Sequence, residues 1–183
     1  MVRHIHQFIT IALKQAFCLL ILWLFGNISL LTPAPAIAQE EMRDSATVIM
    51  YHRFGEDRYP STNIRLAQFE EHLALLTNGD YTILPLPEIV ATLQAGGSLP
   101  DRTVAITIDD AYLSVYEEAW PRLQELGLPF TVFVATEPVE KNRRGYMSWE
   151  MLRELQSAGV TIGSQTHTHP HLYRESPEKV REE

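Results

Sequence analysis

The sequence predicts an α/β fold in which helices cover a parallel β-sheet. Short runs rich in β-branched residues alternate along the chain with longer runs whose apolar residues recur at helical spacing. This alternation is typical of parallel sheets, either doubly wound or closed into a barrel. In both arrangements the functional side chains lie at the carboxyl ends of strands. Two of the expected strands end in Asp-rich or His-rich segments, so the working face of the fold is predicted there.

The first 38 residues are expected to be a secretory signal peptide. Arg3 and Lys14 precede the apolar run 16–24, and Ala36-Ile37-Ala38 has the small-residue pattern of a cleavage site. A single membrane anchor is the alternative, but the apolar run is shorter than the roughly 20 residues that a spanning helix needs. We therefore expect an exported protein, periplasmic or extracellular, with no stable membrane span after cleavage.

Residues 39–183 are expected to contain a short linker, 39–46, and one domain, 47–183. The leader holds two of the 15 Lys and Arg residues and none of the 23 Asp and Glu residues, which leaves the rest with a net charge of −10. This balance argues against nucleic acid as a partner, because nucleic-acid binding requires a basic patch. The sole cysteine, Cys18, lies in the leader, so the domain has neither a disulfide nor thiol chemistry.

Five strands and the helices between them are expected in order. The expected strands are 47–51, 81–84, 103–108, 130–134 and 160–162. The expected helices are 66–76, 86–93, 114–126, 149–158 and one that begins at 176–178. Ser148 and Ser176 have the positions of N-caps, and 53–63 is expected to be a loop. Nothing near Glu183 resembles a helix end, so the chain is expected to hold only the N-terminal part of its domain.

Asp109 and Asp110 directly follow the third expected strand. Side chains alternate along an extended chain, so the two carboxylates should point in different directions. One can then bind a cation while the other faces a bound water. The alternative is that one of them only caps the following helix.

Three histidines, His167, His169 and His171, follow the fifth expected strand. Imidazoles in this arrangement can bind a Zn²⁺-like ion together with Asp110 as an oxygen ligand. A polar surface loop with incidental metal affinity is the alternative. Because the cluster and the Asp pair follow neighbouring strands, the metal interpretation is favoured.

Tyr51 and His52 end the first strand and are expected at the rim of the same site, where they would bind substrate. Packing is the commoner use of such side chains and remains the alternative.

Two segments resemble motifs of a known family. Thr107-Ile108-Asp109-Asp110 resembles the T-F-D-D motif of the polysaccharide deacetylases, the NodB-homology family also known as carbohydrate esterase family four. Residues 163–172 resemble its second motif, G-x-H-[ST]-x-[ST]-H-P-x-L. Met50-Tyr51-His52 is similar to members that deacetylate poly-N-acetylglucosamine. The resemblance implies a distorted (β/α) barrel of seven or so strands, of which about the first five are present.

The resemblance also implies an activity. A member of this family is a metal-dependent hydrolase of non-peptide carbon–nitrogen bonds that removes acetyl groups from an N-acetylated polysaccharide, with an O-acetylated polysaccharide as the alternative substrate. Asp109 would be the general base on a metal-bound water that attacks the acetyl carbonyl, and Asp110 and His169 would be metal ligands. The implied metal is zinc, with cobalt or nickel as alternatives.

Gln165 departs from the pattern, because it stands where the family has its first metal-binding histidine. A neutral amide is a weak Zn²⁺ ligand. Either Gln165 binds through its oxygen, or His171 or His167 replaces it, and we expect His171. The family's later motifs, which include the general acid, would lie beyond Glu183. A catalytically inactive fragment, or a metal- or carbohydrate-binding remnant, is therefore the alternative function.

Overall fold

The computed structural model describes residues 44–183. The predicted signal peptide and linker residues 39–43 lie outside the described residues, so these boundaries stay predictions. Within residues 44–183, no helix is long and apolar enough to cross a membrane.

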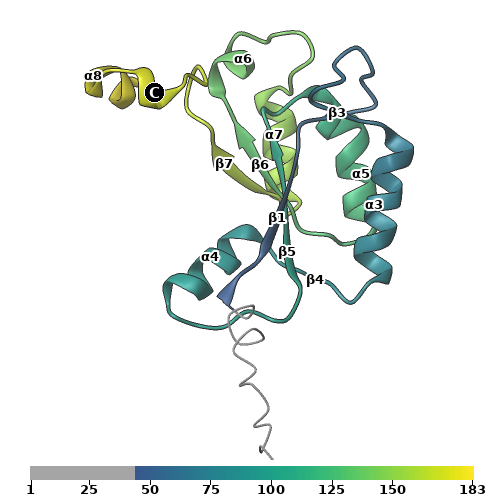
Figure 1. Cartoon of the computed structure of the whole chain (residues 1–183). Coiled ribbons are helices and arrows are strands. Elements are labelled where there is room, and N and C mark those ends of the chain that lie inside the picture. Colours follow the sequence, from purple (N-terminus) through teal and green to yellow (C-terminus); the bar gives the residue numbers. More distant parts are fainter. Residues whose placement is uncertain (1–43) are drawn as a thin grey trace, which may run out of the picture. The chain divides into compact units, whose positions relative to one another are not determined.

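A five-stranded parallel sheet occupies the centre of the described chain (Figure 1). Its middle strand, β5 (Thr103–Asp109), pairs along one edge with β1 (Thr47–Tyr51). Along its other edge it pairs first with β4 (Thr82–Ile83) and then with β6 (Thr131–Val134). The last strand, β7 (Thr161–Ser164), pairs with β6. The first six residues of β5 are buried, as expected for the central strand of a parallel sheet.

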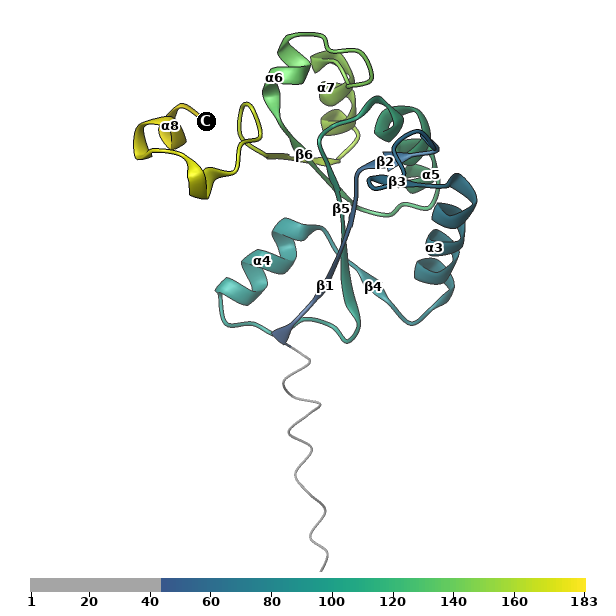
Figure 2. The ribbon, with the colours of Figure 1, turned by 45° about the horizontal axis from the view of Figure 1, so that its top comes forward.

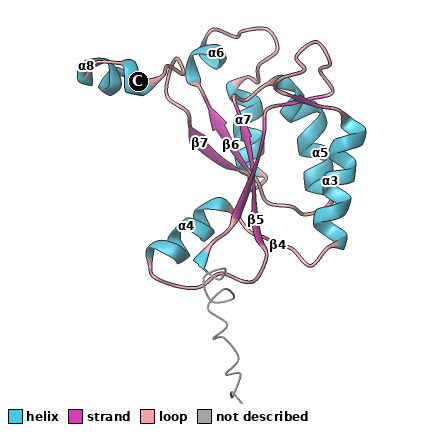
Figure 3. Ribbon diagram, viewed as in Figure 1, coloured by secondary structure: helices cyan, strands magenta, loops and turns pink. Residues whose placement is uncertain are grey.

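Helices cover both faces of this sheet, as the views in Figures 2 and 3 show. On one face, three helices pack against alternate residues of β5, namely Val104, Ile106 and Ile108. These helices are α3 (Leu66–Asn78), α5 (Trp120–Glu125), which continues the π-helical turn Val115–Ala119, and α7 (Trp149–Ser157). On the other face, Ile89 of α4 (Leu86–Gln94) packs against Ala105. Side chains alternate between the two faces along a strand, so Asp109 lies on the same face as Ala105, which is the face that α4 covers.

The sheet face that α4 covers is polar at the level of Thr107. Thr107 is in register with Thr131, which is in register with Thr161. The hydroxyl of Thr131 is buried and has no hydrogen-bond partner among the described residues. Val48 and Met50 of the edge strand β1 are 50% and 59% exposed. These exposed apolar side chains continue the same face outward from the threonines.

The α/β fold with a parallel sheet is confirmed, and the expected strand order along the chain is correct. The serine caps are also correct: Ser148 Oγ accepts from the backbone N–H of Met151 at 3.3 Å, and Ser176 Oγ accepts from that of Lys179 at 3.2 Å. The segment 53–63 is not wholly loop, because β2 (Arg53–Phe54) pairs with β3 (Asn63–Ile64). Two further short elements were not expected, the helix α6 (Thr136–Glu140) and the 3₁₀ turn η3 (Leu172–Arg174). The last described helix is α8 (Pro177–Glu182).

Candidate active site

Four of the residues singled out in the sequence meet beyond the carboxyl ends of β5 and β7. The amide oxygen of Gln165 accepts a hydrogen bond from the backbone N–H of Asp110 at 3.1 Å. Its amide nitrogen lies 2.9 Å from Nε2 of His169 and donates to Oδ2 of Asp109 at 3.4 Å. His169 Nε2 lies 3.9 Å from Oδ1 of Asp110. Gln165 therefore connects the Asp pair of one strand end to the histidine loop of the other.

The orientation of the Gln165 amide follows from its partner. A backbone N–H can only donate, so the atom facing Asp110 N must be the amide oxygen. The –NH₂ group then faces the site, and Nε2 of neutral His169 must accept, with its proton on Nδ1. Gln165 thus enters the site as a hydrogen-bond donor.

The backbone around these residues adopts left-handed conformations. Among the described non-glycine residues with positive φ, four lie in or directly after the two motif segments: Asp110 (72°), Ala111 (53°), Thr166 (68°) and His169 (59°). Side chains disfavour this region of φ, and such residues persist only where the surrounding contacts enforce them. Strained backbone residues often cluster at functional sites, and here they are concentrated at the two strand ends that carry the motifs.

Asp109 is half-buried. Burial raises the pKa of its carboxyl above the ordinary value; the nearby His52 offsets part of that effect, and the Asp110 carboxylate adds to it. A carboxylate with a raised pKa holds a transferred proton better, as a general base must. His52 is half-buried and lines the pocket at the end of β1, and its place at the rim of the site stays a prediction.

Asp110 has a partner that the sequence analysis missed. Burial raises the pKa of the Tyr112 hydroxyl, and its hydrogen bond with Asp110 raises that pKa further. The Tyr112 ring packs against Tyr146 with 4.9 Å between centroids, and the guanidinium of Arg53 lies 3.4 Å from its centroid on the ring face. Tyr112 belongs to neither motif, and the sequence distinguishes it only by its position two residues after Asp110.

The structure corrects the expectation for Tyr51. Its side chain is 7% exposed and packs in the core, with ring centroids 5.7 Å from Phe54 and 5.4 Å from Phe69. Its hydroxyl is hydrogen-bonded to Nδ1 of His72 at 3.0 Å. Tyr51 ends the edge strand β1 and its ring faces α3, so the ring stabilises the core, and Tyr51 is also among the residues that line the pocket beside His52.

The expectation that His171 completes a metal site is also corrected. After left-handed His169, the chain turns at Pro170 into η3, and the exposed His171 ring packs against Tyr173 with centroids 5.8 Å apart. Within residues 44–183, no group of three or more His, Cys, Asp or Glu side chains is placed to hold a metal ion. His167 is used elsewhere, since its Nδ1 is hydrogen-bonded to the Thr136 hydroxyl at 2.8 Å.

The donor atoms that remain fit a divalent cation only in part. Zn²⁺ lies about 2.0–2.2 Å from nitrogen and oxygen ligands, so one ion between Asp110 Oδ1 and His169 Nε2 can contact both across 3.9 Å. Such an ion would replace the hydrogen bond that the single lone pair of Nε2 accepts from the Gln165 amide. The Gln165 oxygen is turned away from this point toward the backbone of Asp110. The site therefore offers two side-chain ligands where the resemblance implies three.

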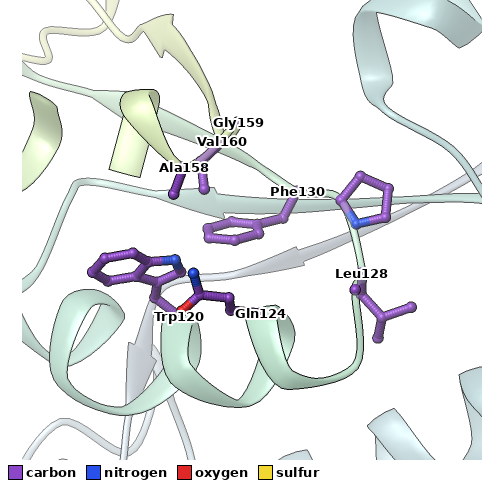
Figure 4. Close-up of a pocket in the computed structure, with 9 residues that line it drawn as sticks. Trp120, Gln124, Leu128, Phe130, Ala158, Gly159 and Val160 are labelled. Atoms are coloured by element: carbon purple, nitrogen blue, oxygen red, sulfur yellow. The ribbon is translucent and has the colours of Figure 1, made fainter. Parts of the chain in front are cut away.

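Two pockets lie at opposite ends of the sheet. One, shown in Figure 4, is lined by Trp120, Phe130 and Val160 and lies at the amino-terminal ends of β6 and β7, away from Asp109. The other is lined by both polar and apolar residues and borders the candidate site at His52. Only the second pocket can contribute to chemistry at Asp109.

Comparison with known proteins gives the same family. Residues 96–183 match the family model described as polysaccharide deacetylase. The chain is 26% identical over 136 residues to the polysaccharide deacetylase-like protein YxkH of Bacillus subtilis (strain 168), covering 74% of this chain and 47% of that protein. It is 32% identical over 110 residues to the poly-β-1,6-N-acetyl-D-glucosamine N-deacetylase of Staphylococcus aureus (strain MSSA476), covering 58% of this chain and 37% of that enzyme. The chain thus spans less than half the length of these two relatives.

Solved deacetylases share the fold. The Streptococcus pyogenes deacetylase PplD in complex with acetate superposes with a TM-score of 0.68 at 21% identity, covering 75% of this chain and 63% of that chain. IcaB from Ammonifex degensii superposes with a TM-score of 0.60 at 29% identity, covering 74% and 57%. The family model matches residues 96–183, just under half of the chain, and the relatives in Bacillus subtilis and Staphylococcus aureus point to the same polysaccharide deacetylase family.

Proposed function

We propose that this protein removes acetyl groups from an N-acetylated polysaccharide by hydrolysis. The observation that carries the proposal is the convergence of Asp109, Asp110 and His169 at the carboxyl ends of β5 and β7. The relative from Staphylococcus aureus is named for N-deacetylation of poly-β-1,6-N-acetyl-D-glucosamine, and that glycan is the first substrate to test.

In the proposed reaction Asp109 acts as the general base. It takes a proton from the water whose oxygen attacks the acetyl carbonyl carbon. The carbon–nitrogen bond then breaks as this proton is passed on to the leaving nitrogen, which gives acetate and a free amine. The hydrogen bond from Gln165 to Oδ2 fixes the orientation of the Asp109 carboxylate. Burial of this carboxylate favours its protonated form and so strengthens it as a base.

We also propose that Asp110 and His169 hold a divalent cation, with zinc as the first candidate and cobalt or nickel as alternatives. Such a cation, when bound, polarises a carbonyl and lowers the pKa of water. Tyr112 donates to Asp110 and keeps its carboxylate in place. With two side-chain ligands and an amide in the third place, we expect weaker binding than a three-ligand site gives.

The pocket beside His52 is the proposed place for the sugar next to the scissile bond. Thr62, Asn63 and Gln68 line it together with His52, and they supply hydroxyl and amide groups suited to sugar hydroxyls. The pocket begins at the end of β1, so a glycan lying in it would reach Asp109.

A second candidate is glycan binding without turnover. The orientation of the Gln165 amide favours this second candidate. Its –NH₂ group donates hydrogen bonds to Asp109 and His169, so both side chains have partners without a bound metal ion. The two candidates predict the same ligand but differ in acetate release.

Acetate release decides between them. The protein is incubated with β-1,6-linked N-acetylglucosamine oligomers, and separately with chitin oligomers, in the presence of Zn²⁺ or Co²⁺. Asp109→Asn and His169→Ala should each lower the rate by about 100-fold or more. His171→Ala is the matched control, since that exposed histidine two residues away contacts Tyr173, and it should keep full activity. Equal acetate from all four proteins would refute the assigned site, and glycan binding with no acetate would favour the second candidate.

We further propose that the protein is exported and that its signal peptide is cleaved after Ala38. The charged start, apolar run and small-residue site of the leader support this proposal. N-terminal sequencing of the mature protein from the cell envelope tests it, and a mature chain that keeps Met1 would contradict it.

A further inference from the structure

The loop that carries His169 is held by a carboxylate from a different element. Oε2 of Glu183, the residue after α8, accepts from the backbone N–H groups of His167 at 3.1 Å and Thr168 at 2.7 Å. Oε1 of the same carboxylate accepts from the Thr168 hydroxyl at 2.7 Å. Three donors from two consecutive residues therefore converge on one side chain.

The Glu183 carboxylate is placed for strong hydrogen bonds. Its side chain is 1% exposed, although every other residue of 171–182 except Lys179 is exposed. Hydrogen bonds from the backbone and hydroxyl of Thr168 lower the pKa of Glu183 to about 2, with a smaller contribution from Lys179 at 3.3 Å. A charged acceptor makes shorter and stronger hydrogen bonds than a neutral one.

The loop needs such support because its conformation is strained. Thr166 and His169, on either side of the two clamped residues, have φ values of 68° and 59°. From α6, the backbone N–H groups of Thr136 and Glu137 donate to the carbonyls of Thr166 and His167 at 3.2 and 2.9 Å. Within the loop, His169 N donates to the Thr166 hydroxyl at 3.1 Å. Non-glycine residues keep positive φ only when their surroundings enforce it. Glu183 supplies the acceptor for the two backbone N–H groups between them, while α6 donates to the loop carbonyls.

We propose that Glu183 is a positioning residue that locks the loop 166–169 and thereby keeps the His169 imidazole beside Asp110 and Gln165. The link from Glu183 to catalysis rests on the proposed function, but the link from Glu183 to the loop does not. Glu183 touches neither Asp109 nor His169 through its side chain, and it acts through the backbone of His167 and Thr168.

The first test measures the loop directly and needs neither metal nor substrate. Amide hydrogen exchange is followed by NMR for His167 and Thr168 in the full chain. Glu183→Ala should lower the protection of both amides at least about tenfold, since hydrogen bonds to charged groups are the strong ones. Glu183→Gln keeps the shape and one acceptor oxygen and should restore part of the protection.

Glu182→Ala is the matched control. Glu182 is the adjacent residue with the same charge, its side chain is 69% exposed, and its ion pair is with Lys179 at 3.5 Å. It should leave both amides unchanged. Protection that survives Glu183→Ala would overturn the proposal, and so would equal losses in Glu182→Ala, which would show a general effect of charge or of helix fraying.

The second test follows the consequence for the site. With N-acetylglucosamine oligomers, Glu183→Ala should lower kcat about tenfold or more with little change in KM, because the pocket at His52 lies on a different element. A fall confined to KM would contradict a positioning role. If the unmodified protein releases no acetate, the proposed function fails while the exchange result still stands.

Discussion

The amide oxygen of Gln165 faces the backbone N–H of Asp110 at 3.1 Å, and this one hydrogen bond decides what Gln165 can do. Rotating the amide to offer its oxygen to a cation would place the –NH₂ group against another donor. The structure therefore disfavours binding of a metal through Gln165, and it explains why the residue links Asp109 to His169 instead.

Gln165→His should raise Zn²⁺ affinity at least about tenfold, because imidazole is a good Zn²⁺ ligand and would join Asp110 and His169 as a third. Isothermal titration of the full chain with Zn²⁺ measures the change. His171→Gln, which alters an exposed histidine that packs on Tyr173, is the control and should bind as the unmodified protein does. An unchanged affinity in Gln165→His would show that this position does not face the ion.

Asp109→Asn should stabilise the metal-free protein at neutral pH. Burial raises the folded-state pKa of Asp109, so keeping this carboxyl ionised costs stability at pH 7. The cost disappears as the pH falls through the folded-state pKa toward the unfolded value of about 4, where the folded state is already protonated. Thermal unfolding with a chelator should show a Tm higher by a few degrees at pH 7.

The advantage of Asp109→Asn should shrink at pH 4. The exposed Asp101 provides the control, and Asp101→Asn should not change Tm at either pH. A lower Tm for Asp109→Asn at pH 7 would mean that the ionised carboxylate stabilises the fold.

Arg53→Lys should destabilise the fold by about 1–3 kcal/mol, because the planar guanidinium is stacked and a lysine ammonium cannot replace it. Arg53 is 8% exposed and lies 3.4 Å from the Tyr112 ring and 3.9 Å from the Tyr59 ring. Urea unfolding measures the loss. Arg58→Lys is the control: its guanidinium also lies on Tyr59, at 4.7 Å, but its side chain is 73% exposed. Equal effects of both changes would show that stacking on Tyr112 contributes nothing.

Gly163→Ala should cost about 1–3 kcal/mol through overpacking. A Cβ atom at this position would lie 2.7 Å from Cδ1 and Cε1 of the Phe133 ring, which neighbours Asp109 in the sheet register. Phe133→Leu in the same chain should recover part of the loss in a double-mutant cycle. Strict additivity of the two changes would show that the ring does not confine Gly163.

The sequence predicted the long elements because each carries a repeated signal. The helix 66–78 and the strands 47–51 and 103–109 have periodic apolar residues, and Ser148 and Ser176 mark helix starts. The pair β2 and β3 was missed because two residues per strand are too few for any period. At the site, adjacency to strand ends identified Asp109, Asp110 and His169. Side-chain direction could not be read from spacing, so Tyr51 and His171 were misplaced, and the roles of Gln165 and Glu183 depend on hydrogen bonds made across the fold.

The pairing of β1 with β5 also has a consequence for how the chain folds. Thr47 is in register with Val104, so 57 positions separate partners that lie side by side in the sheet. Pairings across long stretches of chain form slowly, because the entropy of closing the intervening loop is lost before the contacts are gained. The strands β5, β6 and β7 follow one another at shorter intervals and can assemble first. The first strand of the domain to be synthesised is then among the last to join the sheet, and Tyr51, which is buried in the folded sheet, stays available to other chains until it does.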